Sequence, residues 1–210
     1  MNSVNLDILS PRLKLQFQTD IENALSDPQY CTTLVLRKRG SQTFDPTTGI
    51  STHSWTNTIT YAIKSSLGTT EMPSGKGYGV MEFGDIVFLI SLKDKADVVS
   101  LDKDDRILEL QYDKGAVSVT KGSKAVTGDT TEWAAYGSQG DLFKLKQEPL
   151  SYLNEVASIS TNTALALTSN YAGETKVNQQ YQLWHEYFVV GVETDTWKDL
   201  VVKYIVREIK

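Results

Sequence analysis

The feature that most constrains this chain is the shortness of its apolar runs, the longest of which, Ile86–Ile90, has five residues. Val, Ile, Thr, Tyr, Phe and Trp fill these runs, and clusters of Gly, Asp, Asn and Ser separate them. The first group of residues suits strands and the second suits turns. A membrane-spanning helix needs about 20 apolar residues, so none is expected. The pattern predicts a mainly β chain.

One helix is predicted near the start, over residues 11–25. Ser10 suits the N-cap and Pro11 the first helical position, and Asp27-Pro28 ends the helix because a residue before proline avoids the α region. Apolar residues at helical spacing form one face, which includes Leu13, Phe17 and Ile21.

Strands are predicted over the rest of the chain on either side of a different middle segment. A turn at residues 44–49, with Pro46 to preset φ and Gly49 to accept positive φ, joins the first two strands. One face of the second strand holds Trp55, Asn57, Ile59, Tyr61 and Ile63. The predicted strands are residues 32–39, 55–63, 86–92, 106–112, 186–192 and 200–208.

The middle segment, residues 114–182, differs in amino-acid composition from the rest of the chain. It is rich in Thr, Ser, Gly and Ala, and its six lysines balance six acidic residues. The net charge of −5 therefore belongs to the remainder of the chain. This shift suggests a separate module. A Gly- and Ser-rich loop at residues 65–79 is a second distinct segment, which is long enough to be functional.

No motif indicates catalysis, a metal or a cofactor. His53, His185 and the single Cys31 are too few for an ordinary zinc site. Gly75-Lys76 lacks the spacing and the Ser or Thr of a phosphate loop. The acidic cluster around Asp102 lacks the glycine and distal Glu of an EF-hand. We therefore expect no enzyme, metal site or cofactor.

The lone cysteine and the mild acidity limit where the protein is expected to act and how it is expected to meet DNA. Cys31 has no partner for an internal disulfide, and there is no N-x-S/T site or apolar leader, so secretion is not expected. Acidity argues against a protein that grips DNA phosphates. It is compatible with DNA that slides past.

The outer two thirds of the chain carry a familiar order of elements. The helix and first strand lead into the turn at residues 44–49, a Thr-rich strand and the glycine loop. A closing pair follows, with Tyr187, Val189, Val190 and Val192, then Tyr204, Val206 and Arg207. This order resembles the head-closure (stopper) and head–tail connector proteins of tailed bacteriophages. The resemblance implies a small antiparallel β-barrel or sandwich body with an N-terminal helix.

The middle segment resembles a small all-β module found in phage tail, fibre and neck proteins. The resemblance rests on an ordered set of motifs: Gly115-x-Val117-x-Val119-x-x-Gly122-Ser123, Val126-Thr127-Gly128, Thr131-x-Trp133, Gly140-Asp141-Leu142-Phe143, Val156-Ala157-Ser158-Ile159, Thr163-x-Leu165-x-Leu167, Tyr171-x-Gly173 and Tyr181. Gly122, Gly128 and Gly140 are predicted turn positions. The expected core of the module is Trp133, Phe143, Leu165 and Leu167.

Together the two resemblances predict an inserted domain. A family stopper would run directly from the strand at 107–110 to the strand at 185–192, and residues 114–182 interrupt that hairpin. The expected body is residues 1–113 with 183–210, and the ends of the insert should lie close together. Two consecutive domains, with 183–210 in the second, are the alternative.

The first resemblance implies a structural protein of the virion neck, assembled in the host cytoplasm. It would form a homo-oligomeric ring with the portal or adaptor protein above and the tail-terminator or tail-tube protein below, and it would seal or gate the exit of double-stranded DNA. The expected subunit contacts are Leu13, Phe17 and Ile21. The expected gate is the 65–79 loop, with Ser65, Thr70, Glu71, Lys76 and Tyr78. The module would bind fibre or collar proteins.

A second function from another class remains open. The chain could be a tail-fibre or baseplate component whose 114–182 module recognises a host-surface glycan or protein. Exposed aromatic residues on the module would favour this alternative, and a ring would favour the first.

Overall fold

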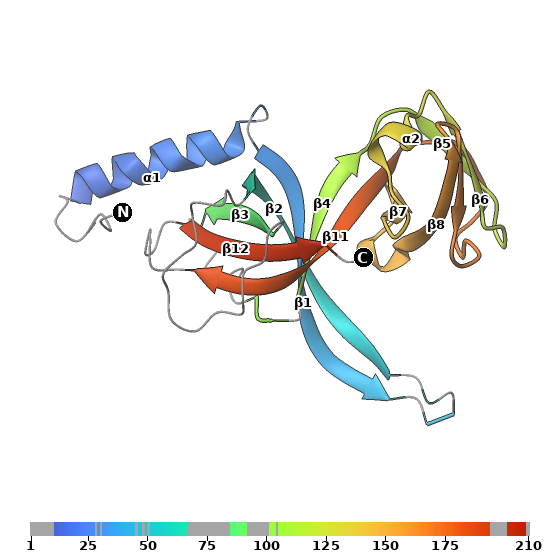
Figure 1. Ribbon diagram of the computed structural model, residues 1–210, viewed down its shortest axis with the longest axis horizontal. Helices are drawn as coiled ribbons and strands as arrows, with labels where there is room; N and C mark the ends of the chain where they lie inside the picture. Colours follow the sequence, from blue (N-terminus) through green and yellow to red (C-terminus); the bar gives the residue numbers. More distant parts are fainter. Residues whose placement is uncertain are drawn as a thin grey trace. The chain divides into compact units, whose positions relative to one another are not determined.

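A computed structural model describes residues 11–27, 29, 31–44, 46–47, 49, 51–66, 85–91, 101–103, 105–193 and 201–208. The chain is mainly β, and the described residues divide into two compact units (Figure 1). Unit 1 comprises the described residues up to Ile107 together with Tyr187–Glu208. Unit 2 comprises Leu108–Glu186, close to the segment expected as an insert.

Unit 1 is built from one helix and six strands within the described ranges, and two of these strands, β4 and β11, continue into unit 2. Helix α1 covers the residues where a helix is predicted, and β4 has the predicted bounds. Strands β1, β2 and β11 are longer than predicted. The elements are α1 (Pro11–Ser26), β1 (Cys31–Phe44), β2 (Ser51–Ser66), β3 (Ile86–Ser91), β4 (Arg106–Tyr112), β11 (Tyr181–Glu193) and β12 (Val201–Glu208).

Unit 2 consists of short strands between β4 and β11. The elements are β5 (Ala116–Val119), β6 (Ala125–Asp129), α2 (Trp133–Tyr136), β7 (Leu142–Leu145), the 3-10 turn η2 (Leu150–Tyr152), β8 (Asn154–Thr161), β9 (Ala164–Leu167) and β10 (Lys176–Gln179). Turns separate strands of four to eight residues. This unit is therefore all-β apart from two single turns of helix.

The strands described here pair in the order β10-β5-β6-β9-β8-β7-β11-β12-β3-β2-β1-β4, and β4 pairs in addition with β11. Each pairing with a described register is antiparallel. Within unit 1 the order therefore returns to its starting strand, because β11 neighbours both β12 and β4. The strands that lead into and out of unit 2 are thus neighbours, as a tolerated insertion requires.

The core of unit 1 comes from alternate residues of its strands. Leu34 and Leu36 of β1 point inward, as do Phe88 of β3 and Tyr204 of β12. The Phe88 ring meets Tyr187 edge-to-face with centroids 5.6 Å apart, which suits the charge distribution of aromatic rings. Burial raises the pKa of the Tyr204 hydroxyl to about 12.

The face of β2 that holds Ile59 and Tyr61 is not the buried face. Ile59 and Tyr61 are 62% and 52% exposed, whereas Thr60 and Ala62, on the opposite face, are buried. Alternation along a strand assigns residues to two faces but does not say which face meets the core. The exposed face of β2 is consequently a surface that needs a separate explanation.

The core of unit 2 holds all four residues expected there: Trp133, Phe143, Leu165 and Leu167. Tyr181 joins them, with its ring edge-on to Trp133 at 5.7 Å and stacked on Phe143 at 5.9 Å. Trp133 Nε1 donates to the Tyr181 hydroxyl at 2.9 Å, and that hydroxyl donates to the Lys114 carbonyl at 2.9 Å. Burial raises the pKa of the Tyr181 hydroxyl well above its usual value, so it stays a donor.

The prediction of a turn at Gly128 is wrong. Gly122 and Gly140 have positive φ, at 79° and 92°, but Gly128 lies inside β6. A Cβ at Gly128 would come 2.9 Å from a carbon of the Trp133 ring. This glycine therefore makes room for the side chains of Thr131 and Trp133, which is a tertiary requirement that turn chemistry does not reveal.

Tyr181→Phe should destabilise unit 2 selectively. The substitution keeps the ring but leaves the Trp133 indole N–H and the Lys114 carbonyl without the hydroxyl, which costs about 1–3 kcal/mol. Urea unfolding followed by circular dichroism measures the loss. Tyr152→Phe, at a tyrosine that is 41% exposed, is the matched control. Equal unfolding midpoints for the two variants would contradict the assigned bonds.

Candidate interaction surfaces

The predicted gate loop is described only at its first residue. Ser65 is exposed near the end of β2. The other four gate residues, Thr70, Glu71, Lys76 and Tyr78, lie outside the described residues. The gate therefore stays a prediction.

The predicted subunit-contact helix exposes apolar side chains at its start. Leu13 is 56% exposed, and Leu15, which the helical-face pattern missed, is 59% exposed. These two leucines lie on opposite sides of the helix, because residues two apart differ by about 200°. The side chains of Phe17 and Ile21 lie outside the description. Helix α1 contacts β1, β2 and β3, yet its first turns leave leucine uncovered.

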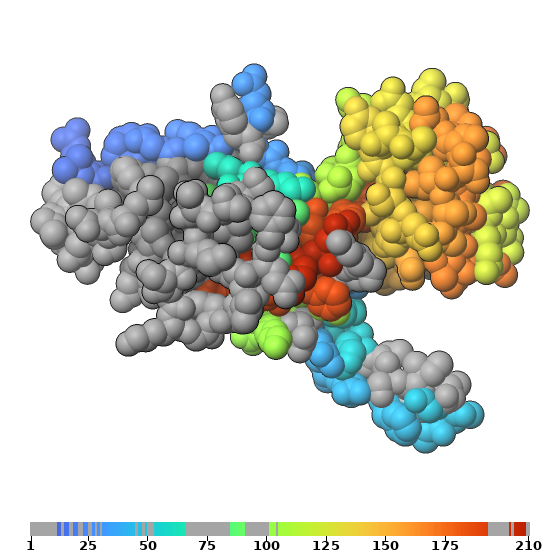
Figure 2. All heavy atoms as spheres, in the orientation of Figure 1, coloured from blue at the N-terminus to red at the C-terminus, as the bar shows by residue number. Residues whose placement is uncertain are grey.

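The far half of the β1–β2 hairpin extends away from the other strands of unit 1. We call residues 38–44 and 51–57 the arm (Figures 1 and 2). Every residue from Lys38 to Phe44 is exposed, and the strands pair with each other out to Phe44 opposite Ser51. The described pairing of β2 with β3 begins only at Ala62. An isolated two-stranded ribbon is only marginally stable in water, so the arm needs an anchor or a partner.

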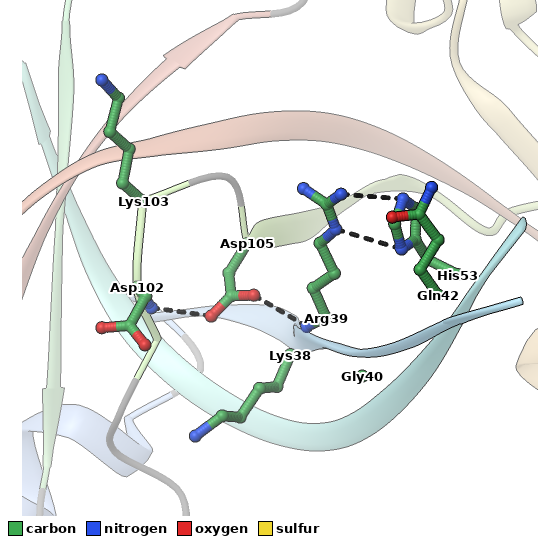
Figure 3. A pocket seen from close by; sticks show the side chains of 8 residues that line it. All are labelled: Lys38, Arg39, Gly40, Gln42, His53, Asp102, Lys103 and Asp105. Carbon is green, nitrogen blue, oxygen red and sulfur yellow. Dashed lines mark hydrogen bonds between the residues drawn. The ribbon is translucent and has the colours of Figure 1, made fainter. Parts of the chain in front are cut away.

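The arm is anchored at its base by a buried carboxylate. Asp105 is 4% exposed, and its two oxygens accept the backbone N–H groups of Arg39 and Asp102, each at 2.7 Å. The Asp105 carbonyl accepts the N–H of Val189 at 3.1 Å. One residue thus connects β1, the segment before β4, and β11 (Figure 3).

An open depression of about 290 Å³ lies beside this anchor (Figure 3). Its lining mixes both charges: Lys38, Arg39, Gly40, Gln42, His53, Asp102, Lys103 and Asp105. The Asp105 carboxylate accepts one backbone N–H group on each of its oxygens. The depression is best described as the junction between the arm and the body.

Basic side chains of the arm and its approach lie against rings. The Arg39 guanidinium contacts both ring nitrogens of His53, at 3.2 and 2.8 Å, and the Arg37 guanidinium lies 4.7 Å from the Trp55 ring centroid. A neutral imidazole has one acceptor nitrogen and no charge. It therefore orients the Arg39 guanidinium without neutralising its positive charge. The arm therefore presents an oriented positive charge.

Unit 2 has its own exposed aromatic surface. Tyr136 is 53% exposed and stacks on the buried Tyr112, with centroids 5.0 Å apart and planes 12° apart. Tyr112 thus covers one face of the Tyr136 ring and fixes its orientation, while the ring remains accessible to solvent. Tyr152 and Val177 are the other large apolar residues that unit 2 exposes in its described part.

The buried polar groups of unit 2 serve the fold. Lys144, 4% exposed, donates from Nζ to the carbonyls of Leu145, Lys146 and Glu148, at 3.0, 3.3 and 2.9 Å. Burial lowers the pKa of Lys144, and Glu148 opposes that shift. The Lys144 ammonium group therefore supplies the hydrogen-bond donors for these three carbonyl groups at a turn.

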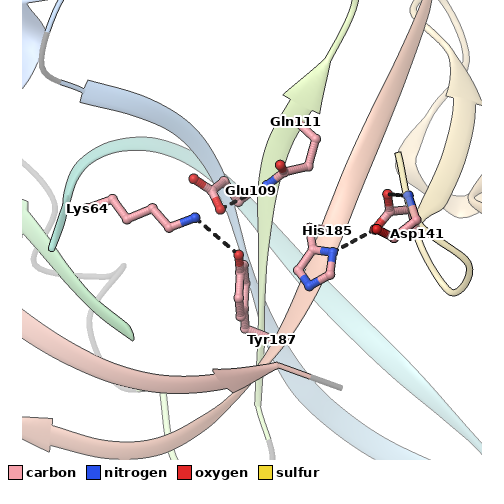
Figure 4. A network of polar contacts seen from close by, with 7 residues as sticks. Lys64, Glu109, Gln111, Asp141, His185 and Tyr187 are labelled. Atoms are coloured by element: carbon pink, nitrogen blue, oxygen red, sulfur yellow. Dashed lines mark hydrogen bonds and ion pairs between the residues drawn. The ribbon is translucent and has the colours of Figure 1, made fainter. Parts of the chain in front are cut away.

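Two further polar pairs appear in Figure 4. In unit 2, His185 Nδ1 lies 2.6 Å from the buried carboxylate of Asp141, which also accepts the Ser138 N–H. In unit 1, Lys64 Nζ donates to the Tyr187 hydroxyl at 3.3 Å. The residues described hold no group of three His, Cys, Asp or Glu placed to bind a metal ion. Across the same residues, no helix is long and apolar enough to span a membrane.

Comparison with known proteins gives no assignment, because no protein-family model matches the chain and no curated protein matches its sequence.

Asp105→Ala should loosen the arm at its base. Two backbone N–H groups lose their acceptor, which should cost unit 1 about 1–3 kcal/mol and speed hydrogen exchange at the Arg39 amide. Denaturant unfolding and exchange mass spectrometry measure the two effects. Asp102→Ala, which removes an exposed carboxylate, is the control and should change stability by less than about 0.5 kcal/mol. Indistinguishable variants would refute the anchoring role.

Proposed function

We propose that this chain is a structural virion protein of a tailed-phage neck. It assembles as a ring between portal and tail, seals or gates DNA exit, and docks the tail. The supporting observation is the strand order of unit 1, in which β4 and β11 are neighbours although unit 2 lies between them in the chain. That is the arrangement implied by a head-closure body with a module inserted in its last hairpin.

The body in this proposal is a small barrel. Six strands, in the order β11-β12-β3-β2-β1-β4, pair in a cycle around one apolar core. A closed sheet has no free edge over its paired length, which suits a subunit that must repeat in a ring without growing into fibres. The 65–79 loop stays the gate that the resemblance implies.

Charge supports a channel role for the body. The net charge of −5 falls outside residues 114–182, so an acidic lumen would repel phosphate and let DNA pass without adhering. The portal or adaptor protein above and the tail-terminator or tail-tube protein below would contact the two ends of the ring. Unit 2 would bind fibre or collar proteins.

The direct test removes the gene from a phage that encodes this chain. We expect heads that package DNA but lose it, together with free tails, and rescue by the full chain in trans. Electron microscopy of the particles and measurement of retained DNA give the result. Normal particles with attached tails would refute the neck role.

Replacing residues 114–182 with a short Gly-Ser linker should leave ring formation intact. The strands on either side of the cut are already neighbours, so a short connection can join them. Native mass spectrometry of the shortened and full chains compares their assemblies. An unfolded product would show that unit 2 is part of the body rather than a guest.

A second function is supported by the surface of unit 2. An exposed tyrosine fixed by stacking, as Tyr136 is on Tyr112, is a platform that fits the flat face of a sugar ring. This supports a tail-fibre or baseplate module that recognises a host-surface glycan.

Tyr136→Ala should then weaken binding to the host's surface polysaccharide roughly two- to twelvefold, since aromatic stacking contributes about 0.5–1.5 kcal/mol. Glycan-array binding measures the change. Val177→Ser, at an exposed apolar residue that offers no ring, is the control. No binding by the unmodified chain would remove this candidate.

A further inference from the structure

The exposed tyrosine of α2 has carboxylates on the segments around it. Tyr136 is the last residue of α2, and its backbone N–H donates to the Glu132 carbonyl one turn earlier, at 3.3 Å. Asp113 directly follows Tyr112, the residue on which the Tyr136 ring stacks. Glu132 and Asp113 are both exposed. We call the stacked pair of Tyr112 and Tyr136 the tyrosine platform.

The two carboxylates lie close enough to act on the tyrosine platform. Burial raises the pKa of the Tyr112 hydroxyl, the negative charge of Glu132 raises it further, and Asp113 makes a smaller contribution in the same direction. Salt screens exposed charges over about 10 Å, so charges that act on this hydroxyl are its near neighbours. The platform therefore combines an open ring face with a local negative field.

Charge differs in sign between the two ends of the β5–β6 hairpin. Ala116 pairs with Asp129 at the first end, next to the platform, and Val119 pairs with Val126 at the second. The charged residues at the first end are Asp113, Lys114, Asp129 and Glu132. Those at the second end are Lys121, Lys124, Glu174 and Lys176. Three acids and one base give the first end −2, and three bases and one acid give the second +2.

The acidic end has no basic strand beside it on the α2 side. Strand β8, which α2 contacts, carries Glu155 and no lysine or arginine. In the described part of the chain, these carboxylates do not form a group of three placed to bind a metal ion. An ammonium group needs no fixed coordination geometry, and it is attracted both to carboxylates and to the negative face of an aromatic ring. The platform is therefore suited to an organic cation.

We propose that the tyrosine platform binds the ammonium group of an amine-bearing glycan. This inference rests on the second function proposed above and names the class of sugar that unit 2 recognises. The ring face of Tyr136 that Tyr112 leaves open takes a cation within about 6 Å of its centroid, and the neighbouring carboxylates strengthen the attraction. A neutral sugar keeps only the stacking contact, and an anionic sugar is repelled by Glu132.

A matched pair of oligosaccharides tests the inference on the full chain. The tetramer of β-1,4-linked glucosamine carries ammonium groups, and its N-acetylated counterpart has the same backbone without charge. At mildly acidic pH and low salt, we expect the amine form to bind about threefold more tightly, and high salt to reduce the difference. Titration followed by NMR chemical shifts measures both dissociation constants, and the largest shifts should fall on residues 132–137.

A charge-removing variant separates the site from general attraction. Glu132→Gln keeps the size of the side chain and should weaken binding of the amine form about two- to fivefold, the range of an exposed ion pair. It should leave binding of the acetylated form unchanged. Glu174→Gln removes an exposed acid at the other end of the hairpin, so it is the matched control and should change neither. Tyr136→Ala should weaken both forms, because it removes the ring.

The alternative outcomes separate the sugar class from the glycan-binding function. Equal affinity for the two tetramers would overturn the inference and leave glycan binding standing. A preference for the amine form that Glu132→Gln and Glu174→Gln reduce equally, or that Tyr136→Ala leaves intact, would show attraction by net charge and also overturn it. Binding of neither tetramer would overturn the inference alone, since the host's own polysaccharide tests the function.

Discussion

The pairing of β4 with β11 is the constraint on which the rest of this structure depends. It returns the strand order of unit 1 to its start and makes neighbours of the two strands that enter and leave unit 2. A segment inserted between neighbouring strands can fold around its own core. The two cores accordingly share no residue: one centres on Trp133 and Tyr181, the other on Phe88 and Tyr204.

The β1–β2 hairpin is longer than the body of unit 1 requires. Its near half contributes Leu34 and Leu36 to the core, while the β1 residues of its far half, Lys38 to Phe44, are all exposed. Asp105 orders the base of the arm through two backbone N–H groups, and a bulge in β1 turns Phe44 toward the exposed face.

Sequence patterns predicted the features that depend on residues close together in the chain. The capping and spacing around Pro11 predicted α1, and alternation in the module predicted that Leu165 and Leu167 are core residues. What these patterns could not predict depends on residues distant in sequence: which face of β2 is buried, and why Gly128 must be small. The sequence does not show where the arm begins. The strand pattern of β1 and β2 continues without a break past the point where other strands stop packing beside them. The candidate surfaces carry the same limit, since the exposed face of β2 is known only once the register of β1 and β2 is known.

Hydrogen exchange across β4 and β11 tests the central claim most directly. If these strands pair and close the order of unit 1, amides of residues 106–112 and 187–192 should exchange as slowly as those of the core strands β3 and β12. The Val189 amide, bonded to the Asp105 carbonyl, should be among the slowest. Exchange of both segments at the rate of the exposed arm, residues 38–44, would contradict the closed order and with it the inserted-module account.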